Sequence, residues 1–215
     1  MTTLREELNA FQDQFNTMAP DAATAFVNMI NELKDKGVGK GLEVGAKAPD
    51  FTLADATGKK VTLSEKLANG PVILVFYRGE WCPFCNLQLK AYQSIINEIK
   101  DSGAELIAIS PQTPDHSLTM KEKNELSFSV LSDMGGKVTE SYNLKFSMPE
   151  YYREIHKGLG VNLDELNGND SWELLVPATY VINKEGIIVA GVSDPDYRTR
   201  MEPTEALNVI RSLNK

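Results

Sequence analysis

The sequence predicts an α/β fold in which helices flank a mixed central sheet, and three observations carry this prediction. Residues 72–76 form a continuous run of β-branched, aliphatic and aromatic side chains, as in a strand buried on both faces. Helical stripes alternate with such runs along the middle of the chain. Near the end, a turn at residues 183–186 separates two apolar runs and indicates an antiparallel hairpin. Parallel and antiparallel strands together make the predicted sheet mixed.

The N-terminal segment, residues 1–41, is expected to form a helical extension ahead of a main domain of residues 42–215. Apolar side chains recur there at steps of three and four, at Leu4, Leu8, Phe11, Phe15 and Met18. Pro20 interrupts this stripe, and a second helix runs from about Asp21 to Gly37. The extension is a homodimer contact, a lid, or a pair of helices packed on the flank of the domain. Residues 37–41 are the candidate linker.

The main domain is expected to begin with an antiparallel strand pair and a buried strand. Residues 51–53 and 61–63 flank a turn at residues 55–58. Strand 72–76 then leads into a helix. The apolar stripe of this helix consists of Leu87, Ala91, Ile95 and Ile99, with Tyr92 and Ile96 beside them.

Strands and helices alternate over the rest of the chain. We expect strands at residues 106–109 and 128–131, helices at 119–125 and 136–143, hairpin strands at 178–182 and 187–192, and a closing helix at 204–213. Residues 145–171 are rich in glycine, asparagine and charge and show no clear period. We expect a long loop there, with at most a short helix at 151–157. Such an excursion in a compact domain is usually functional or mobile.

The two cysteines, Cys82 and Cys85, stand where the buried strand turns into the helix. Cys82 is at the expected N-cap and Pro83 at the first helical position, where a missing N–H costs nothing. The free N–H groups and the positive end of the helix dipole favour a thiolate at such a place. The spacing also lets the two sulfurs close and reopen a small disulfide ring. The sequence therefore predicts redox chemistry at this turn.

Composition and charge argue against several classes of partner. The chain has 215 residues and is 42% hydrophobic, which is enough for a domain with a real core. A net charge of −8 and a pI near 4.9 argue against nucleic acid and anionic membrane. No apolar run approaches the ~20 residues of a membrane span, and we expect no signal peptide. The expected location is the cytoplasm, where a lone Cys-x-x-Cys is more often catalytic than structural.

Several motifs together resemble a known family. Residues 81–85 after a buried strand resemble the active-site turn of thioredoxin-fold proteins, and residues 176–180 resemble their cis-proline strand. More closely, the chain resembles the peroxiredoxin-like branch of the alkyl hydroperoxide reductase/thiol-specific antioxidant family over about residues 42–213. The motifs of that branch lie at residues 45–51, 75–82, 109–115 and 196–203. The resemblance implies a thioredoxin-like fold, hydroperoxide reduction and a thioredoxin-type reductant, with no metal or cofactor.

The chain departs from the peroxidase motif Pro-x-x-x-Thr-x-x-Cys of this family. Arg78 falls at the proline, Cys82 at the threonine and Cys85 at the peroxide-attacking cysteine. The activating arginine of the family falls at Pro177. Two of these four groups are therefore replaced, and a third has become a second thiol.

Four further residues are candidates for positioning a substrate. Arg78 could supply a guanidinium from a new position, and the preferred alternative is an arginine that faces solvent and pairs with Glu80 or with nothing. Trp81 either shields the dithiol or belongs to the core. Val176 and Pro177 are expected to present backbone groups beside the dithiol.

Three functions are open at this point. The first is a peroxidase, in which a thiolate attacks a hydroperoxide to give a sulfenic acid that condenses to a disulfide. The second is a thiol–disulfide oxidoreductase acting on protein or small-molecule disulfides, which a cis bond before Pro177 would favour. The third is a metal or structural role, but zinc normally takes four ligands, and His116 and His156 are expected to be ordinary surface residues. We favour the peroxidase, with cycling of the dithiol as its mechanism.

Two structural features test this hypothesis. The Val176–Pro177 bond should be cis and lie beside the sulfurs, and a trans bond would argue against the thioredoxin-like fold. Segment 145–171 is expected to be able to cover the dithiol. It ends just before Pro177, so its ends should be anchored near the active site. Its expected contacts with a substrate or with the domain surface are Tyr151, Tyr152 and Trp172.

The attacking sulfur is expected to be that of Cys82. An N-cap side chain accepts a hydrogen bond from an amide two or three residues on, so the amide of Cys85 can hold a thiolate on Cys82. Cys82 should also lie at the mouth of the turn, whereas Cys85 should be more buried and so keep its proton. The alignment with the peroxiredoxin motif nominates Cys85 instead.

Overall fold

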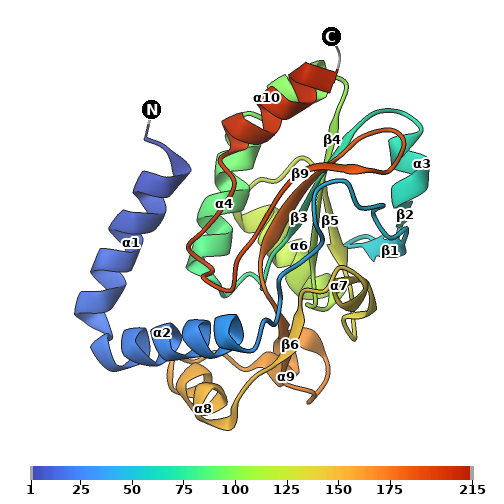
Figure 1. Ribbon diagram of the computed structural model, residues 1–215. Helices are drawn as coiled ribbons and strands as arrows, with labels where there is room; N and C mark the ends of the chain where they lie inside the picture. Colours follow the sequence, from blue (N-terminus) through green and yellow to red (C-terminus); the bar gives the residue numbers. More distant parts are fainter. Residues whose placement is uncertain (1, 214–215) are drawn as a thin grey trace.

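The computed structural model describes residues 2–213 and confirms the predicted mixed sheet flanked by helices (Figure 1). The main sheet has the strand order β2-β1-β5-β4-β3-β8-β9, and β6 pairs with β7 in a second, two-stranded sheet. β3, β4 and β5 are parallel, and the other neighbours are antiparallel. The strands are β1 (Thr52–Asp55), β2 (Lys60–Thr62), β3 (Val72–Phe76), β4 (Glu105–Ser110), β5 (Ser129–Ser132), β6 (Lys145–Ser147), β7 (Glu173–Leu175), β8 (Ala178–Ile182) and β9 (Ile188–Ser193).

Most helices lie where the sequence predicts them, with shifted ends, but the short helices Leu63–Leu67 and Leu163–Asn167 were not predicted. The helices are α1 (Leu4–Met18), α2 (Pro20–Asp35), α3 (Leu63–Leu67), α4 (Pro83–Ser94), α5 (Ile96–Asp101), α6 (Pro114–Lys123), α7 (Lys137–Ser141), α8 (Glu150–Gly158), α9 (Leu163–Asn167) and α10 (Pro203–Leu213). The helix expected after the cysteines is interrupted at Ile95, which caps both α4 and α5. α6 begins earlier than expected, because Pro114 fits the first helical position.

β3 is the central support of the dithiol turn. All five of its side chains are fully buried, and the strand pairs with β4 on one side and with β8 on the other. Burial of each such side chain contributes about 1.5–3 kcal/mol relative to exposure. The residues that follow β3, including both cysteines, are therefore held on the most stable part of the sheet.

The two N-terminal helices pack on the main domain of the same chain. α1 begins with a capping box between Thr3 and Glu6 and lies against α4, where the rings of Phe11 and Phe84 meet edge to face at 5.1 Å (Figure 1). α2 lies beside α8, at the lower side of Figure 1. Of the three alternatives for the N-terminal extension, the structure therefore shows a pair of helices packed on the flank of the domain. The predicted stripe of α1 ends before Met18, which is 74% exposed.

The predicted linker at residues 37–41 is a tightly packed turn instead. Gly39 and Gly41 have φ angles of +70° and +72°, which side chains rarely adopt. A Cβ on Gly39 would lie 2.2 Å from a methyl group of Val176, and one on Gly41 would lie 2.2 Å from the hydroxyl of Tyr180. Glycine at these two positions therefore lets the turn pack closely against residues 176–180, and the turn is not a flexible linker.

The expectation of a long loop at residues 145–171 is wrong, because β6, α8 and α9 make up most of this segment, but the short helix expected at 151–157 is confirmed as α8. α8 carries Glu150 in its first turn and His156 and Lys157 in its last, in agreement with the helix dipole. Tyr152 and His156 are buried against the rest of the molecule. The two rings are four positions apart on α8, and both contact the ring of Phe26 on α2, at 5.1 and 5.7 Å.

Within residues 2–213, no helix has the length and the hydropathy that a membrane span requires.

Candidate active site

Cys82 and Cys85 lie where the sequence predicts, at the start of α4. Cys82 is the N-cap with extended φ and ψ angles, and Pro83 is the first helical residue. The amide of Cys85 donates to Cys82 Sγ at 3.4 Å, so the predicted N-cap contact is confirmed. The two free thiols touch, with their sulfurs 2.7 Å apart. Both residues are 0% exposed, so the expectation that Cys82 is open to solvent is wrong.

Arg78 is buried in the site, and the expectation that it faces solvent is wrong. The residue is 4% exposed, and its Nη2 donates to Cys82 Sγ at 3.3 Å. The guanidinium lies over the ring of Tyr197 at 4.2 Å and that of Trp81 at 5.3 Å. Glu80, its expected partner, pairs with His116 at 2.6 Å instead. The described residues give Arg78 no carboxylate partner, so the dithiol is its counter-charge.

A second guanidinium, from Arg200, approaches the other sulfur. Its Nη2 lies 3.7 Å from Cys85 Sγ. Its Nε donates to the carbonyl of Tyr197 at 2.6 Å, and its Nη1 donates to Oε1 of Gln88. The motif at residues 196–203 contains Arg198 and Arg200, and the sequence predicted no role for either. Their place in a motif of the resembled family was the signal that could have pointed to Arg200.

The two thiols ionise as a pair. Burial raises the pKa of Cys82 above its ordinary value, and the hydrogen bond to Cys85 raises it further. Burial acts in the same direction on Cys85, but the thiol hydrogen bond between the sulfurs and the charges of Arg200 and Arg78 outweigh it and hold the pKa of Cys85 well below its ordinary value. The pair therefore holds one negative charge and one proton between two guanidinium groups. The charge lies mainly on Cys85, so the expectation that Cys85 keeps its proton is wrong.

The segment at residues 145–171 lies against the dithiol, as expected, through two residues of α8. The ring of His156 meets Trp81 edge to face at 5.3 Å and lies 4.4 Å from the ring of Tyr152. Tyr152 lies near Arg78 and Cys82, whose charges act on its pKa. His156 is 1% exposed, so the expectation of a surface histidine is wrong. Burial and Arg78 lower the pKa of His156 to about 4, so the ring is neutral.

The other two residues expected in this segment lie farther out. The hydroxyl of Tyr151 donates to Glu32 Oε1 on α2 at 2.7 Å. Trp172 is buried against α8, under the cations of Arg153 and Lys157. Both therefore contact the surface of their own chain. His116 is partly buried beside Glu80.

The Val176–Pro177 bond is not cis, and this expectation is wrong, since no peptide bond in residues 2–213 is cis. The amide of Val176 donates to the carbonyl of Leu144 at 2.9 Å, so the chain runs extended from β7 into β8. A trans bond continues that path. The side chain of Val176 packs against the turn at Gly39. Pro177 is buried directly before Ala178, which faces Phe76 at the end of β3.

Three side-chain donors around the dithiol are buried without a hydrogen-bond partner. They are Arg78 Nε, Trp81 Nε1 and the hydroxyl of Tyr152. A buried donor that stays unpaired costs about 1–3 kcal/mol. The Arg78 guanidinium lies over the ring of Trp81 and also donates to Cys82. The groups around Arg78 can therefore offer hydrogen bonds to the oxygen atoms of a small molecule.

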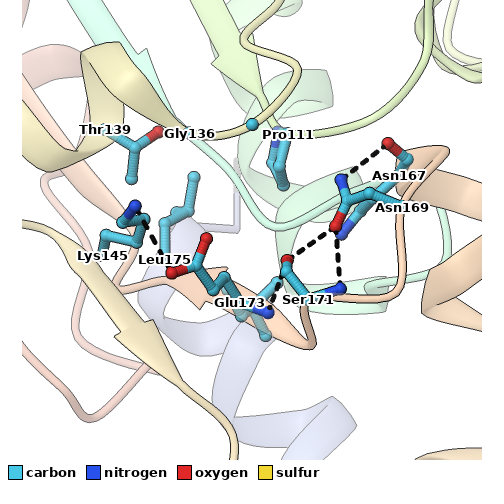
Figure 2. A pocket seen from close by; sticks show the side chains of 11 residues that line it. Pro111, Gly136, Thr139, Lys145, Asn167, Asn169, Ser171, Glu173 and Leu175 are labelled. Carbon is cyan, nitrogen blue, oxygen red and sulfur yellow. Dashed lines mark hydrogen bonds and ion pairs between the residues drawn. The ribbon is translucent and has the colours of Figure 1, made fainter.

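A second hollow lies at β6, β7 and α9 and does not compete as an active site. Figure 2 shows Pro111, Gly136 and Thr139 facing Asn167 and the other lining residues across it. The space open to water-sized molecules there is about 20 Å³, which is enough for a water molecule and too small for a substrate.

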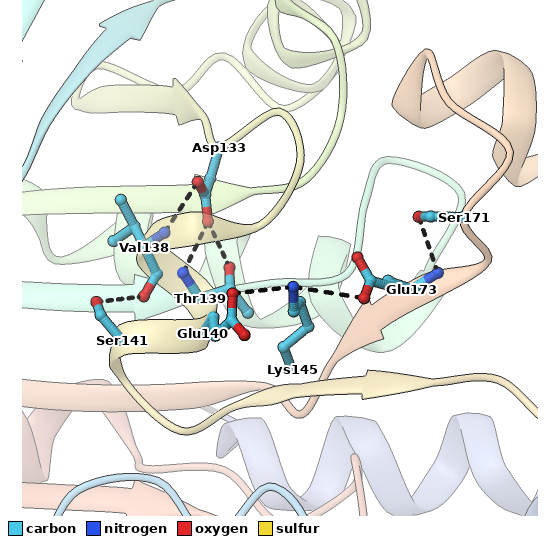
Figure 3. Close-up of polar contacts among 8 residues, drawn as sticks. All are labelled: Asp133, Val138, Thr139, Glu140, Ser141, Lys145, Ser171 and Glu173. Carbon is cyan, nitrogen blue, oxygen red and sulfur yellow. Dashed lines mark hydrogen bonds and ion pairs between the residues drawn. The ribbon is translucent and has the colours of Figure 1, made fainter.

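The charged groups at this hollow already have structural partners (Figure 3). Lys145 bridges Glu140 at 3.1 Å and Glu173 at 3.4 Å. Asp133 accepts from the amides of Val138 and Thr139 and so caps α7. The charges hold β6, β7 and α7 together.

In residues 2–213, no three His, Cys, Asp or Glu side chains gather as metal ligands.

Comparison with known proteins gives a consistent result. The model of the AhpC/TSA family matches residues 44–190. The chain is 26% identical over 202 residues to the chloroplastic peroxiredoxin Q of Sedum lineare, covering 94% of this chain and 96% of that protein. It is 28% identical over 149 residues to a putative peroxiredoxin bcp of Coxiella burnetii, covering 69% and 87%.

Solved structures share the fold. The peroxidoxin BcpB of Mycobacterium tuberculosis superposes with a TM-score of 0.63 at 22% identity, over 81% of this chain and 99% of that one. A peroxiredoxin-like protein from Aquifex aeolicus gives 0.64 at 17% identity, over 82% and 90%. The thioredoxin-like fold is thus confirmed, and it stands without the cis bond that we expected to be necessary for it.

Proposed function

We propose, from the membership of this chain in the AhpC/TSA family, that it reduces hydroperoxides by cycling Cys82 and Cys85 between a dithiol and a disulfide. The observation that carries the proposal is the pair of touching, buried thiols at a helix N-terminus between two guanidinium groups. Such surroundings stabilise the thiolate that peroxide reduction requires.

The first step begins with a proton shift. The pair holds one proton, and its transfer from Cys82 to Cys85 over 2.7 Å leaves a thiolate on Cys82. That thiolate is held by Arg78 Nη2 and by the amide of Cys85. Arg78 Nε and Trp81 Nε1 remain free to bind the two oxygens of the hydroperoxide. Cys82 is therefore the proposed attacking sulfur.

The reaction then proceeds in three steps, which are attack on the hydroperoxide, proton transfer to the leaving group and closure of the disulfide. Cys82 Sγ forms a bond to the terminal oxygen of the hydroperoxide, and the O–O bond breaks to release an alkoxide or hydroxide. The Cys85 thiol gives its proton to this leaving group. The Cys85 thiolate attacks the sulfenic sulfur of Cys82, and the expelled hydroxide takes a proton from solvent to become water. The products are a disulfide, water and the alcohol, or a second water.

Full burial of both sulfurs favours small hydroperoxides over protein disulfides as the oxidising substrate. The distinguishing feature of the disulfide-exchange alternative, a cis bond at Pro177, is absent, and no other observation favours it. We propose a thioredoxin-type dithiol as the reductant, which requires that the turn expose Cys82 Sγ once the disulfide has formed. We also propose the cytoplasm, a reducing compartment, as the location.

Single-cysteine variants test the proposal. Cys85→Ser should accumulate a sulfenic acid on Cys82 when hydrogen peroxide is added, detected with a dimedone-type reagent and mass spectrometry. Cys82→Ser should not react at a comparable rate. A sulfenic acid on Cys85 in the Cys82→Ser protein, formed as fast as in wild type, would reverse the two roles. No sulfenic acid in either variant would overturn the proposed function.

A further inference from the structure

Residues 196–203 contribute side chains to the dithiol site, and none of these side chains takes part in the peroxidase steps proposed above. They reach the site at two points. The ring of Tyr197 lies 4.2 Å from the Arg78 guanidinium, and Arg200 approaches Cys85. The cysteines and this motif are far apart in sequence, so the fold must bring them together.

Arg200 is fixed so that one end of its guanidinium is left for Cys85. Nε is bound to the carbonyl of Tyr197, and Nη1 is bound to Gln88. Gln88 is itself held by Thr179 Oγ1 at 3.1 Å. The remaining nitrogen, Nη2, lies 3.7 Å from Cys85 Sγ. The orientation of the guanidinium is therefore set before any substrate binds.

The charge of Arg200 has no other counter-ion among the described residues. The side chain is 8% exposed, and none of the ion pairs within residues 2–213 involves it. A buried guanidinium without a carboxylate favours any anion that it can reach. Each sulfur thus has its own cation, with Arg78 on Cys82 and Arg200 on Cys85.

We infer that Arg200 is a catalytic residue for the second step, in which it holds Cys85 as the thiolate that attacks the sulfenic acid on Cys82. The inference rests on the proposed function and divides the work between the two arginines. Arg78 serves the attack on peroxide. Arg200 serves the closure of the disulfide, and it also stabilises Cys85 as the thiolate that leaves when an external thiol later reopens the ring at Cys82.

The first test is independent of peroxide chemistry. In Cys82→Ser, thiolate ultraviolet absorbance against pH reports the pKa of Cys85 alone. Adding Arg200→Gln should raise that pKa by at least one unit, whereas adding Arg198→Gln, the neighbouring arginine paired with Asp196, should leave it unchanged. Arg200→Lys should retain part of the effect. An unchanged pKa in Arg200→Gln would overturn the inference even if the enzyme is a peroxidase.

The second test separates the two steps. Stopped-flow tryptophan fluorescence with hydrogen peroxide should show an attack phase that is at least as fast in Arg200→Gln as in wild type, because a higher pKa of Cys85 favours the proton on Cys85 and the thiolate on Cys82. Disulfide closure should slow at least tenfold, and overoxidation of Cys82 to sulfinic acid should rise. Circular dichroism shows whether the variant is folded, and if it is not, Arg200→Lys carries the test. A slower attack with unchanged closure, or a sulfenic acid first on Cys85, would place Arg200 on the attacking sulfur and overturn the inference while the proposed function stands.

Discussion

Replacing Arg78 with methionine should weaken the acidity of the dithiol and lower its reduction potential together. The guanidinium is 4% exposed and lies 3.3 Å from Cys82 Sγ. Methionine keeps an unbranched apolar side chain against the rings of Trp81 and Tyr197 but carries no charge. The substitution therefore removes the charge and keeps most of the packing.

The size of the effect follows from the geometry. At an effective dielectric constant of about 20, two unit charges at this separation interact by about 5 kcal/mol. Because the two sulfurs share the negative charge, we take half of this energy, about 2.5 kcal/mol, which corresponds to about two pKa units. The thiolate exists only in the reduced protein, so its loss of stabilisation should also lower the reduction potential by about 50 mV.

Two measurements check this prediction. Thiolate ultraviolet absorbance against pH gives the apparent pKa of the pair, and equilibration in dithiothreitol buffers gives the potential. Arg153→Met is the matched control, since Arg153 lies over Trp172 and touches neither sulfur. If Arg78→Met changed the pKa by less than half a unit and left the potential unchanged, the contact with Cys82 would not be a charge interaction.

Three further predictions concern His156, Phe11 and Gly39. The pKa of His156 is lowered to about 4 by burial and a nearby guanidinium, so the unfolded chain binds the extra proton first as the pH falls. The free energy of unfolding of wild type should therefore decrease by about 3 kcal/mol between pH ~6.5 and ~4, and His156→Phe should lack this part of the decrease in urea titrations. Phe11→Ala should lower the free energy of unfolding by about 2 kcal/mol, because it removes the aromatic contact between α1 and α4. Met18→Ala should leave the free energy of unfolding unchanged, because Met18 is exposed. Equal losses in the two variants would contradict the packing of α1. Gly39→Ala should lower the free energy of unfolding by at least ~2 kcal/mol more than Gly160→Ala does. Both glycines have positive φ angles, but only a Cβ on Gly39 would lie 2.2 Å from a methyl group. Equal losses of stability in thermal unfolding would contradict the close packing of the turn at Gly39.

Local signals predicted the part of the site that lies within one strand and one helix. The buried run at residues 72–76, the N-cap cysteine and Pro83 specify the β3–α4 turn without reference to the rest of the chain. The sheet was predictable for the same reason, since each strand carries its own apolar pattern. The N-cap hydrogen bond to Cys82 follows directly from the spacing.

The groups that set the charge of the dithiol were not predictable from local pattern. An arginine after a strand is usually exposed, and Arg78 is buried only because Tyr197 and α8 cover it. Arg200 meets Cys85 across 115 positions in the sequence. The expected cis bond at Pro177 was carried over by analogy, and no peptide bond within residues 2–213 is cis. Each of these features depends on tertiary contacts.

The most direct measurement of the central claim is the thiol balance of the reduced wild-type protein after one equivalent of hydrogen peroxide. The account predicts that both free thiols disappear in one turnover, with a Cys82–Cys85 disulfide and no added oxygen in the intact mass. Dithiothreitol should restore both thiols and allow a second identical turnover. If both thiols survived an equivalent of hydrogen peroxide and of a small organic hydroperoxide, or if the mass rose by oxygen atoms without disulfide formation, the dithiol would not be a peroxidase centre.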